Sequence, residues 1–193
     1  MKVSAAVSFF ALFLLGAQVL HAQDLPAPGS REISFWVSGG RGTTGSTANS
    51  GVFSIGVRYG WILTAPHGPG PLRGSFEYAV DVSPLYFVAQ RKNSIGANIN
   101  PVIFKWNFNS HGRIAPYVEI SGGSLYTNHE VPFGTSNVNF SPGAAVGLQY
   151  LGRKWNPVFA LRYVHISNAG LSEPNPGINT VQFLIGLNHF RRH

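Results

Sequence analysis

The sequence contains no cysteine, so neither a disulfide framework nor thiol chemistry is available to this chain of 193 residues. Charged residues are scarce as well: they make up 11% of the chain, against about 25% in ordinary soluble domains. Beyond the N-terminal segment, no stretch is long and apolar enough to cross a membrane as a helix. Low charge combined with scattered apolar residues favours many half-buried strands, and the length suits one domain.

The N-terminal segment has the three parts of a secretory signal peptide. Lys2 precedes a short apolar run, Val3–Leu15, and the small residue Ala22 marks a cleavage site. We expect cleavage after Ala22, which divides the chain into a signal peptide at 1–22 and one mature domain at 23–193. A retained anchor is disfavoured because the run is short for a span of about 20 residues.

Basic residues outnumber acidic ones. With Lys2 removed, 13 Lys and Arg face 7 Asp and Glu, a net charge of +6. This surplus suits an anionic surface such as phosphorylated lipid, and it equally serves plain solubility. We expect no nucleic-acid partner, no cofactor and no metal. Four of the histidines outside the motif described below are scattered along the predicted barrel: His67, His111, His129 and His189.

Large apolar side chains alternate with small or polar ones from about Glu32 onward. The clearest stretch is Val52 to Trp61, and 74–83 and 138–150 repeat it. In a soluble barrel the bulky face would be the interior. Here the opposite face carries Gly, Ser, Ala and isolated charges, which suit a narrow polar interior, so we expect the bulky face to contact lipid. Strands of about 10 residues with this pattern are typical of transmembrane barrels.

We therefore predict an all-β fold, an eight-stranded antiparallel transmembrane β-barrel, which is also about the minimum barrel size. Pro101 breaks the phase of the fourth strand and predicts a bulge. The four tryptophans are expected in interfacial girdles near strand ends. The charged residues expected in an interior polar network are Arg58, Glu77, Asp81 and Glu119. The predicted strands are 31–41, 51–62, 74–88, 94–108, 113–126, 138–151, 156–167 and 178–190.

Polar residues of the last two strands fall on the face that we expect to contact lipid. His165 and Ser167 are two apart, so they share a face of the seventh strand, and Asn179 lies on the bulky face of the eighth. Adjacent antiparallel strands can bring Asn179 and His165 into contact. An isolated strand histidine is usually structural, but polar groups facing lipid are costly unless paired. This placement therefore favours a functional site.

The segment from Arg162 to Asn179, RYVHISNAGLSEPNPGIN, resembles the PagL family of outer-membrane lipid A 3-O-deacylases. A weaker resemblance covers 74–84, the Asn100–Pro101 region and 116–119. The resemblance implies an eight-stranded barrel that hydrolyses the ester-linked acyl chain at position 3 of lipid A, without a metal or cofactor. The shared core is His165, Ser167, Asn168, Ala169 and Gly170, followed by Pro174, Asn175 and Gly177.

By position, the resemblance makes His165 the general base and Ser167 the nucleophile. The family's acid falls at Asn179, which accepts a hydrogen bond from imidazole but brings no charge. We expect Asn179 to orient His165, with Glu173 as the alternative source of an acid. Asn168, beside the nucleophile, resembles the family's oxyanion-hole position.

The strand order predicts the level of the site in the membrane. If both ends of the mature chain lie in the periplasm, the seventh strand finishes at Ser167 and the eighth starts at Asn179 on the extracellular side. This level is the outer leaflet, which agrees with the substrate that the resemblance implies: lipid A, or lipopolysaccharide, in the outer membrane of a Gram-negative bacterium. The predicted function is a serine esterase, a carboxylic ester hydrolase of the lipid A 3-O-deacylase type.

Two alternatives remain. The first is a non-catalytic small outer-membrane barrel with a structural or adhesion role, and the asparagine at the acid position is the best argument for it. The second is a soluble exported barrel of the lipocalin type that binds a ligand, in which the bulky face would point inward.

Overall fold

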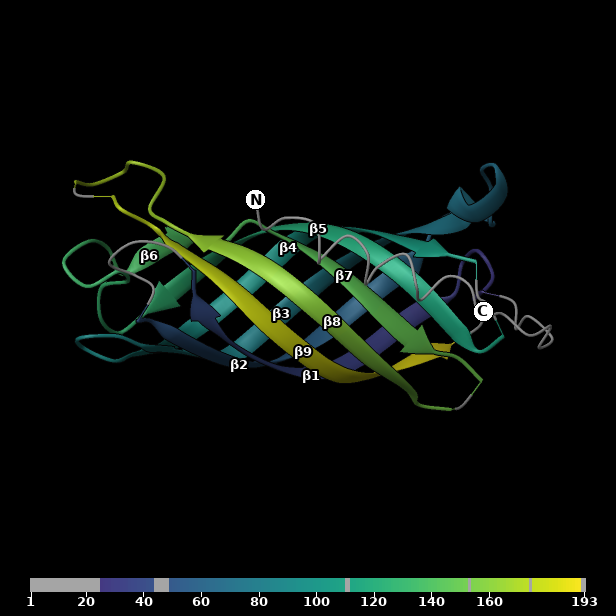
Figure 1. Cartoon of the computed structure of the whole chain (residues 1–193), viewed down its shortest axis with the longest axis horizontal. Helices are drawn as coiled ribbons and strands as arrows, with labels where there is room; N and C mark the ends of the chain where they lie inside the picture. Colours follow the sequence, from purple (N-terminus) through teal and green to yellow (C-terminus); the bar gives the residue numbers. More distant parts are fainter. Residues whose placement is uncertain (1–24, 44–48, 110–111, 153, 174, 192–193) are drawn as a thin grey trace, which may run out of the picture.

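A closed cylinder of antiparallel strands makes up the part of the chain that the structure describes. The computed structural model describes residues 25–43, 49–109, 112–152, 154–173 and 175–191, and the predicted signal peptide at 1–22 lies outside them. The strands are β1 (Arg31–Gly42), β2 (Gly51–Ile62), β3 (Gly74–Ala89), β4 (Ser94–Phe108), β5 (Ile114–Thr127), β6 (Val138–Phe140), β7 (Gly143–Tyr150), β8 (Asn156–Ile166) and β9 (Ile178–Arg191), with a short 3-10 helix, η2 (Gly70–Leu72), before β3. They pair in the order β4-β3-β2-β1-β9-β8-β7-β5, and β4 pairs with β5 to close the cylinder (Figure 1).

β6 and β7 are the two halves of the predicted sixth strand. Both pair with β5, and Ser141 and Pro142 separate them. Proline has no N–H to donate to a ladder, which accounts for the interruption. With these halves counted as one strand, the described residues form an eight-stranded barrel, so the predicted fold class is confirmed. Within the described ranges, no helix has the length and apolarity needed to span a bilayer.

The bulky face of the strands points outward, as the alternation predicts. Phe35, Ile120 and Phe183 are 53%, 60% and 52% exposed. Their strand neighbours Ser34 and Leu184 are buried. Apolar side chains outside and small or polar ones inside are the arrangement of a transmembrane barrel. The alternative of a soluble barrel with its bulky face inward is therefore wrong.

The bulge predicted at Pro101 is confirmed. Before it, Ile95 and Ile99 of β4 face outward, and after it Val102 and Phe104 do so. The register between β4 and β5 shifts between Ile99 and Val102. The bulge thus moves the outward face from odd to even positions, which keeps both halves of β4 apolar toward lipid.

The predicted interior network is present for three of its four members. Arg58 forms ion pairs with Asp81 (Nε–Oδ1, 2.7 Å) and with Glu119 (Nη1–Oε2, 2.7 Å). Arg162 adds a contact to Asp81 (Nη2–Oδ2, 3.1 Å). All four side chains are largely or fully buried, so each charge is neutralised inside the barrel rather than by solvent.

Glu77, the fourth predicted member, belongs to a second interior cluster. The ammonium of Lys105 lies 2.7 Å from a carboxylate oxygen of Glu32 and 3.1 Å from one of Glu77. Trp36 also lies inside: it is 5% exposed, and the guanidinium of Arg162 sits 4.7 Å from its ring. The prediction that Trp36 belongs to an interfacial girdle is wrong, because it occupies an inward position of β1.

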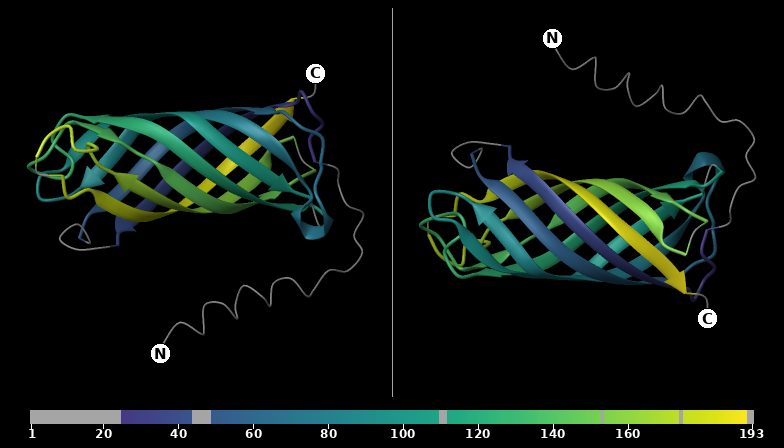
Figure 2. Two further views of the ribbon diagram at one scale, coloured as in Figure 1. Left: turned by 90° about the horizontal axis from the view of Figure 1, so that it is seen from above. Right: turned by 90° about the horizontal axis from the view of Figure 1, so that it is seen from below.

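The two ends of the barrel are distinct. Arg31, in the first position of β1, pairs with Arg191, in the last position of β9. We call this the terminal end. The connections from β8 to β9 and from β5 to β6 lie at the opposite end (Figure 2), which we call the loop end. Because neighbouring strands are antiparallel, the end of β8 and the start of β9 meet at the loop end.

Candidate active site

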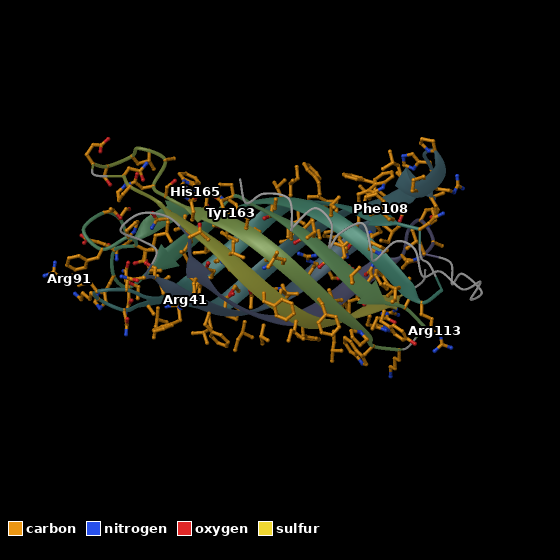
Figure 3. The ribbon with its side chains drawn as sticks, in the orientation of Figure 1. Arg41, Arg91, Phe108, Arg113, Tyr163 and His165 are labelled. Carbon is orange, nitrogen blue, oxygen red and sulfur yellow. The ribbon has the colours of Figure 1, made fainter. Side chains whose placement is uncertain are left out.

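β8 and β9 bring a histidine and an asparagine together on the outward face. His165 and Asn179 are direct partners in the antiparallel ladder, and each lies on the same face as the outward residues of its strand. Directly opposite side chains on one face lie about 5 Å apart at Cβ, so imidazole and amide can meet. Nδ1 of His165 is 2.7 Å from Oδ1 of Asn179. Figure 3 shows His165 and Tyr163 toward the loop end of the barrel.

Ser167 follows β8 directly and is held by the backbone of β6. Two N–H···O bonds of 2.7 and 3.1 Å join Ser167 to Phe140, so the backbone of Ser167 stays fixed although β8 ends at Ile166. The Oγ of Ser167 lies 3.0 Å from Nε2 of His165. The serine is 7% exposed, and its hydroxyl is presented to the ring nitrogen.

The three side chains form one directed chain of hydrogen bonds. An imidazole with its hydrogen on Nδ1 donates to Oδ1 of Asn179, and its unprotonated Nε2 then accepts the hydroxyl hydrogen of Ser167. This is the tautomer in which a histidine can take a proton from a serine. The amide oxygen of Asn179 is neutral, so it orients the ring without adding charge.

Tyr163 is a fourth member that sequence reasoning missed. Its hydroxyl donates to Oδ1 of Asn179 over 2.7 Å. Tyr163 is two residues before His165 on the same outward face of β8. A tyrosine two residues from a candidate base on a lipid-facing strand was the available signal, since its hydroxyl needs a partner there.

Gly177 lies against the imidazole. A Cβ built at this position would be 2.8 Å from Cε1 of His165, which leaves no room for a side chain. The backbone φ of Gly177 is also +64°, in the left-handed region that favours glycine. The structure therefore explains why glycine occupies position 177: the backbone passes close to the imidazole ring just before β9 begins.

Asn168 organises the turn that follows the serine. It is 1% exposed, and its side-chain Nδ2 donates to the carbonyl oxygen and the hydroxyl of Ser172. Its Oδ1 accepts the N–H of Gly170, and its own N–H donates to Oδ1 of Asn175. Ala169, which lies between Asn168 and Gly170 in the turn, has a φ of +54°. These bonds direct the polar atoms of Asn168 into the loop.

Glu173 lies elsewhere. It is exposed in the connection between β8 and β9, while both ring nitrogens of His165 are occupied by Ser167 and Asn179. The structure thus brings His165, Ser167 and Asn179 together and leaves Glu173 apart from them.

Fold and site together define a class of protein. It is a β-barrel of the outer-membrane type whose outward face carries a serine, a histidine and an asparagine that are linked by hydrogen bonds. The sequence model of the family described as lipid A 3-O-deacylase (PagL) matches residues 53–188, well over half of the chain. The chain belongs to this family.

Two solved structures share the fold. One is described as the outer membrane enzyme PagL, with 19% identity over 80% of this chain and 97% of that chain and a TM-score of 0.57. The other is Neisserial surface protein A, with 13% identity over 86% of this chain and 99% of that chain and a TM-score of 0.60. Identities this low speak for the fold alone. No curated protein matches the chain.

Proposed function

We propose that this protein is a serine esterase that removes the acyl chain ester-linked at position 3 of lipid A. The carrying observation is the chain of contacts from Asn179 through His165 to Ser167, with distances of 2.7 and 3.0 Å, on the outward face of a membrane barrel. Membership of a family described as lipid A 3-O-deacylase supports the choice of substrate. The proposal includes export by a signal peptide at 1–22 and insertion in the outer membrane of a Gram-negative bacterium.

The first half of the reaction acylates the serine. Nε2 of His165 takes the hydroxyl proton as Oγ of Ser167 attacks the ester carbonyl carbon, which gives a tetrahedral oxyanion. When this intermediate collapses, the bond to the sugar oxygen breaks, and the imidazolium returns its proton to that oxygen. The sugar leaves as an alcohol, and the acyl chain stays on Ser167.

The second half releases the fatty acid. A water molecule gives a proton to His165 and attacks the acyl-serine ester, and collapse restores the hydroxyl of Ser167. The products are a free 3-hydroxy fatty acid and lipid A that lacks this chain. A site on the outward face suits a substrate that stays embedded in the bilayer, because only its ester has to reach the serine.

Asn179 orients the base in this proposal, and its neutral amide leaves the imidazolium without an anionic partner. The direct contact with Nδ1 favours Asn179 over Glu173 for this role. Asn168 is proposed to contribute to the oxyanion hole. For its side-chain amide to do so, Nδ2 has to exchange its bond to Ser172 for one to substrate.

The test is mass spectrometry of lipid A from a Gram-negative host that expresses the chain, the Ser167→Ala variant, or neither. We expect the wild-type chain to produce lipid A that lacks one 3-hydroxyacyl group, and Ser167→Ala to leave lipid A intact while the barrel still folds. Ser124→Ala, at an exposed outward position of β5, is the matched control and keeps activity. Glu173→Gln distinguishes Asn179 from Glu173 as the partner of His165, since this substitution leaves the activity unchanged if Asn179 is the orienting residue. Full activity of Ser167→Ala would falsify the mechanism.

A second candidate is a non-catalytic surface barrel. The observation that favours it is the amide at Asn179, where an anionic partner would help stabilise the imidazolium. In that case lipid A from all of these hosts carries the same acyl chains.

A further inference from the structure

Two arginines stand directly opposite each other at the terminal end of the barrel. Arg31 of β1 and Arg191 of β9 are ladder partners, and both are exposed on the outward face. Like charges directly opposite each other on neighbouring strands are destabilising, and their Cβ atoms lie about 5 Å apart. An arrangement of this kind calls for an anion between the two guanidinium groups.

The chain itself offers these arginines no carboxylate within the described residues. The ion pairs formed there are all interior. Glu32, next to Arg31 in sequence, points into the barrel and pairs with Lys105 at 2.7 Å. Arg31 instead donates to the hydroxyl of Tyr59 over 3.2 Å, which fixes one side of its guanidinium and leaves further donors in the fork.

An apolar groove lies on the same strands, nearer the middle of the membrane. It is an open hollow of about 380 Å³ on the outer surface of β9, β1 and β2. Its lining includes Phe35, four residues from Arg31, and Leu187, four residues from Arg191. At about 3.4 Å of rise per residue, these positions are about 14 Å along the strands from the arginines. One leaflet of a bilayer has a hydrocarbon depth of about 15 Å, so the groove is within reach of an acyl chain whose headgroup meets the arginines.

Aromatic side chains connect the rim to the groove. Trp155 packs 5.8 Å from the ring of Phe35 and 5.4 Å from that of His189. Nδ1 of His189 lies 2.6 Å from the carbonyl oxygen of Lys154, which holds the turn before β8 against β9. Tryptophan at this level of a membrane protein lies among lipid headgroups.

We infer that the guanidinium pair Arg31–Arg191 and the groove below it form one binding site for an anionic glycerophospholipid in the leaflet on the side of the termini. The phosphate lies between the two arginines and accepts charge-assisted hydrogen bonds from both. One acyl chain runs past Trp155 into the groove beside Phe35 and Leu187. This site is separate from Ser167, at the other end of β8, and does not depend on the proposed function.

The test measures lipid binding by native mass spectrometry of the full chain, refolded in a non-ionic detergent and titrated with dioleoyl phosphatidylglycerol. The double variant Arg31→Ser/Arg191→Ser should bind this lipid about tenfold more weakly, as expected for the loss of paired charge-assisted contacts. The control Arg73→Ser/Arg113→Ser removes the same charge from connections elsewhere at the terminal end, and it should bind as the parent does. Figure 3 shows Arg113 at that end, away from His165.

A second variant tests the groove separately. Val37→Phe places a larger apolar side chain in the lining of the groove and should weaken binding of the lipid. In a separate measurement, excess inorganic phosphate should fail to displace the lipid from the parent chain, because phosphate has no acyl chain to occupy the groove. Equal binding by both arginine doubles would overturn the inference. So would a wild-type chain that appears as a dimer without lipid and loses the dimer in Val37→Phe, because a second copy would then occupy the groove. Preferential retention of lipid A over phosphatidylglycerol would overturn it as well.

Discussion

The barrel carries polar groups in two places, and they are arranged in opposite ways. Inside, the charges are matched: Arg58 meets both Asp81 and Glu119 at 2.7 Å. Outside, His165 lies on the outward face, and the hydrogen bonds run in one direction, from the hydroxyl of Ser167 through the imidazole to the amide oxygen of Asn179. Both regions satisfy the rule that polar groups shielded from water need partners. They differ in whether they contain a group that remains able to react with a substrate.

The interior clusters pair every carboxylate with a cation, whereas the outward group ends in a serine hydroxyl that is a potential nucleophile. Each interior carboxylate already accepts from a cation, so rearranging one pair leaves a charge unpaired. Ser167 donates its hydroxyl hydrogen to His165, and a hydroxyl oxygen keeps lone pairs with which it can attack an ester carbonyl. The interior pairs stabilise the barrel, and the outward group is the one to which we assign the proposed reaction. Variants of the two regions should therefore separate stability from activity.

The largest expected effect is on catalysis, in the exterior group. His165→Ala should lower kcat for acyl release by about 10^4-fold, because the serine then lacks its base. The double variant His165→Ala/Ser167→Ala should be no slower than either single one, since residues that act as one unit are not additive. Release of fatty acid from lipid A in detergent micelles measures both. Multiplying losses in the double variant would mean that the two residues act independently.

The next largest effect is on stability, in the interior. Arg58→Met leaves Glu119 and part of Asp81 without their main cation, and removing one partner of a buried pair costs about 3–5 kcal/mol. The urea midpoint of unfolding should drop, while kcat of the folded fraction stays unchanged. Arg41→Met, at an exposed position near the loop end, is the control and should shift stability by no more than about 0.5 kcal/mol. If Arg58→Met lowered kcat and left the unfolding midpoint unchanged, the assignment of stability to the interior and of activity to the outward group would be wrong.

Much of this division could be predicted from the sequence. Period-two alternation gave the eight strands and the outward face, because a barrel with lipid outside must place large apolar residues on alternate positions. The phase change at Pro101 predicted the bulge that is found between Ile99 and Val102. The two-residue spacing of His165 and Ser167 predicted a shared face. These features are local, and local pattern is what a sequence reports directly.

Features that depend on which strands become neighbours could not be predicted. Lys105, Glu32 and Glu77 come from β4, β1 and β3 and meet only across the closed interior. Trp36 looked like an interfacial residue, but the interior has room for it where Gly56 and Gly186 are its ladder partners. The contact between Gly177 and the ring of His165 likewise needs the exact course of the chain into β9.

That contact offers a sharper test of the exterior group. Gly177→Ala should lower kcat by about 10^2-fold, because the new methyl displaces the imidazole and a shift of about 1 Å is enough for such a loss. Gly170→Ala is the matched control: its φ is +79° and nothing lies within 4 Å of its Cβ position. Both substitutions strain the backbone, and only the first touches His165. Fatty-acid release and the unfolding midpoint, measured together, separate displacement of the ring from strain; an equal loss of activity in both variants would assign it to strain.

The smallest expected effect comes from Tyr163, whose hydroxyl shares Oδ1 of Asn179 with His165. If the phenol helps to hold the amide oxygen toward the ring, Tyr163→Phe should lower kcat by about fivefold, the equivalent of one neutral hydrogen bond of about 1 kcal/mol. KM should not change, since the ring itself stays against lipid. Asn179→Asp should make the same Tyr163→Phe change matter less, because a carboxylate has no amide nitrogen to turn toward the imidazole and needs no phenol to orient it. An undiminished fivefold loss in the Asn179→Asp background would show that Tyr163 acts by some route other than orienting the amide.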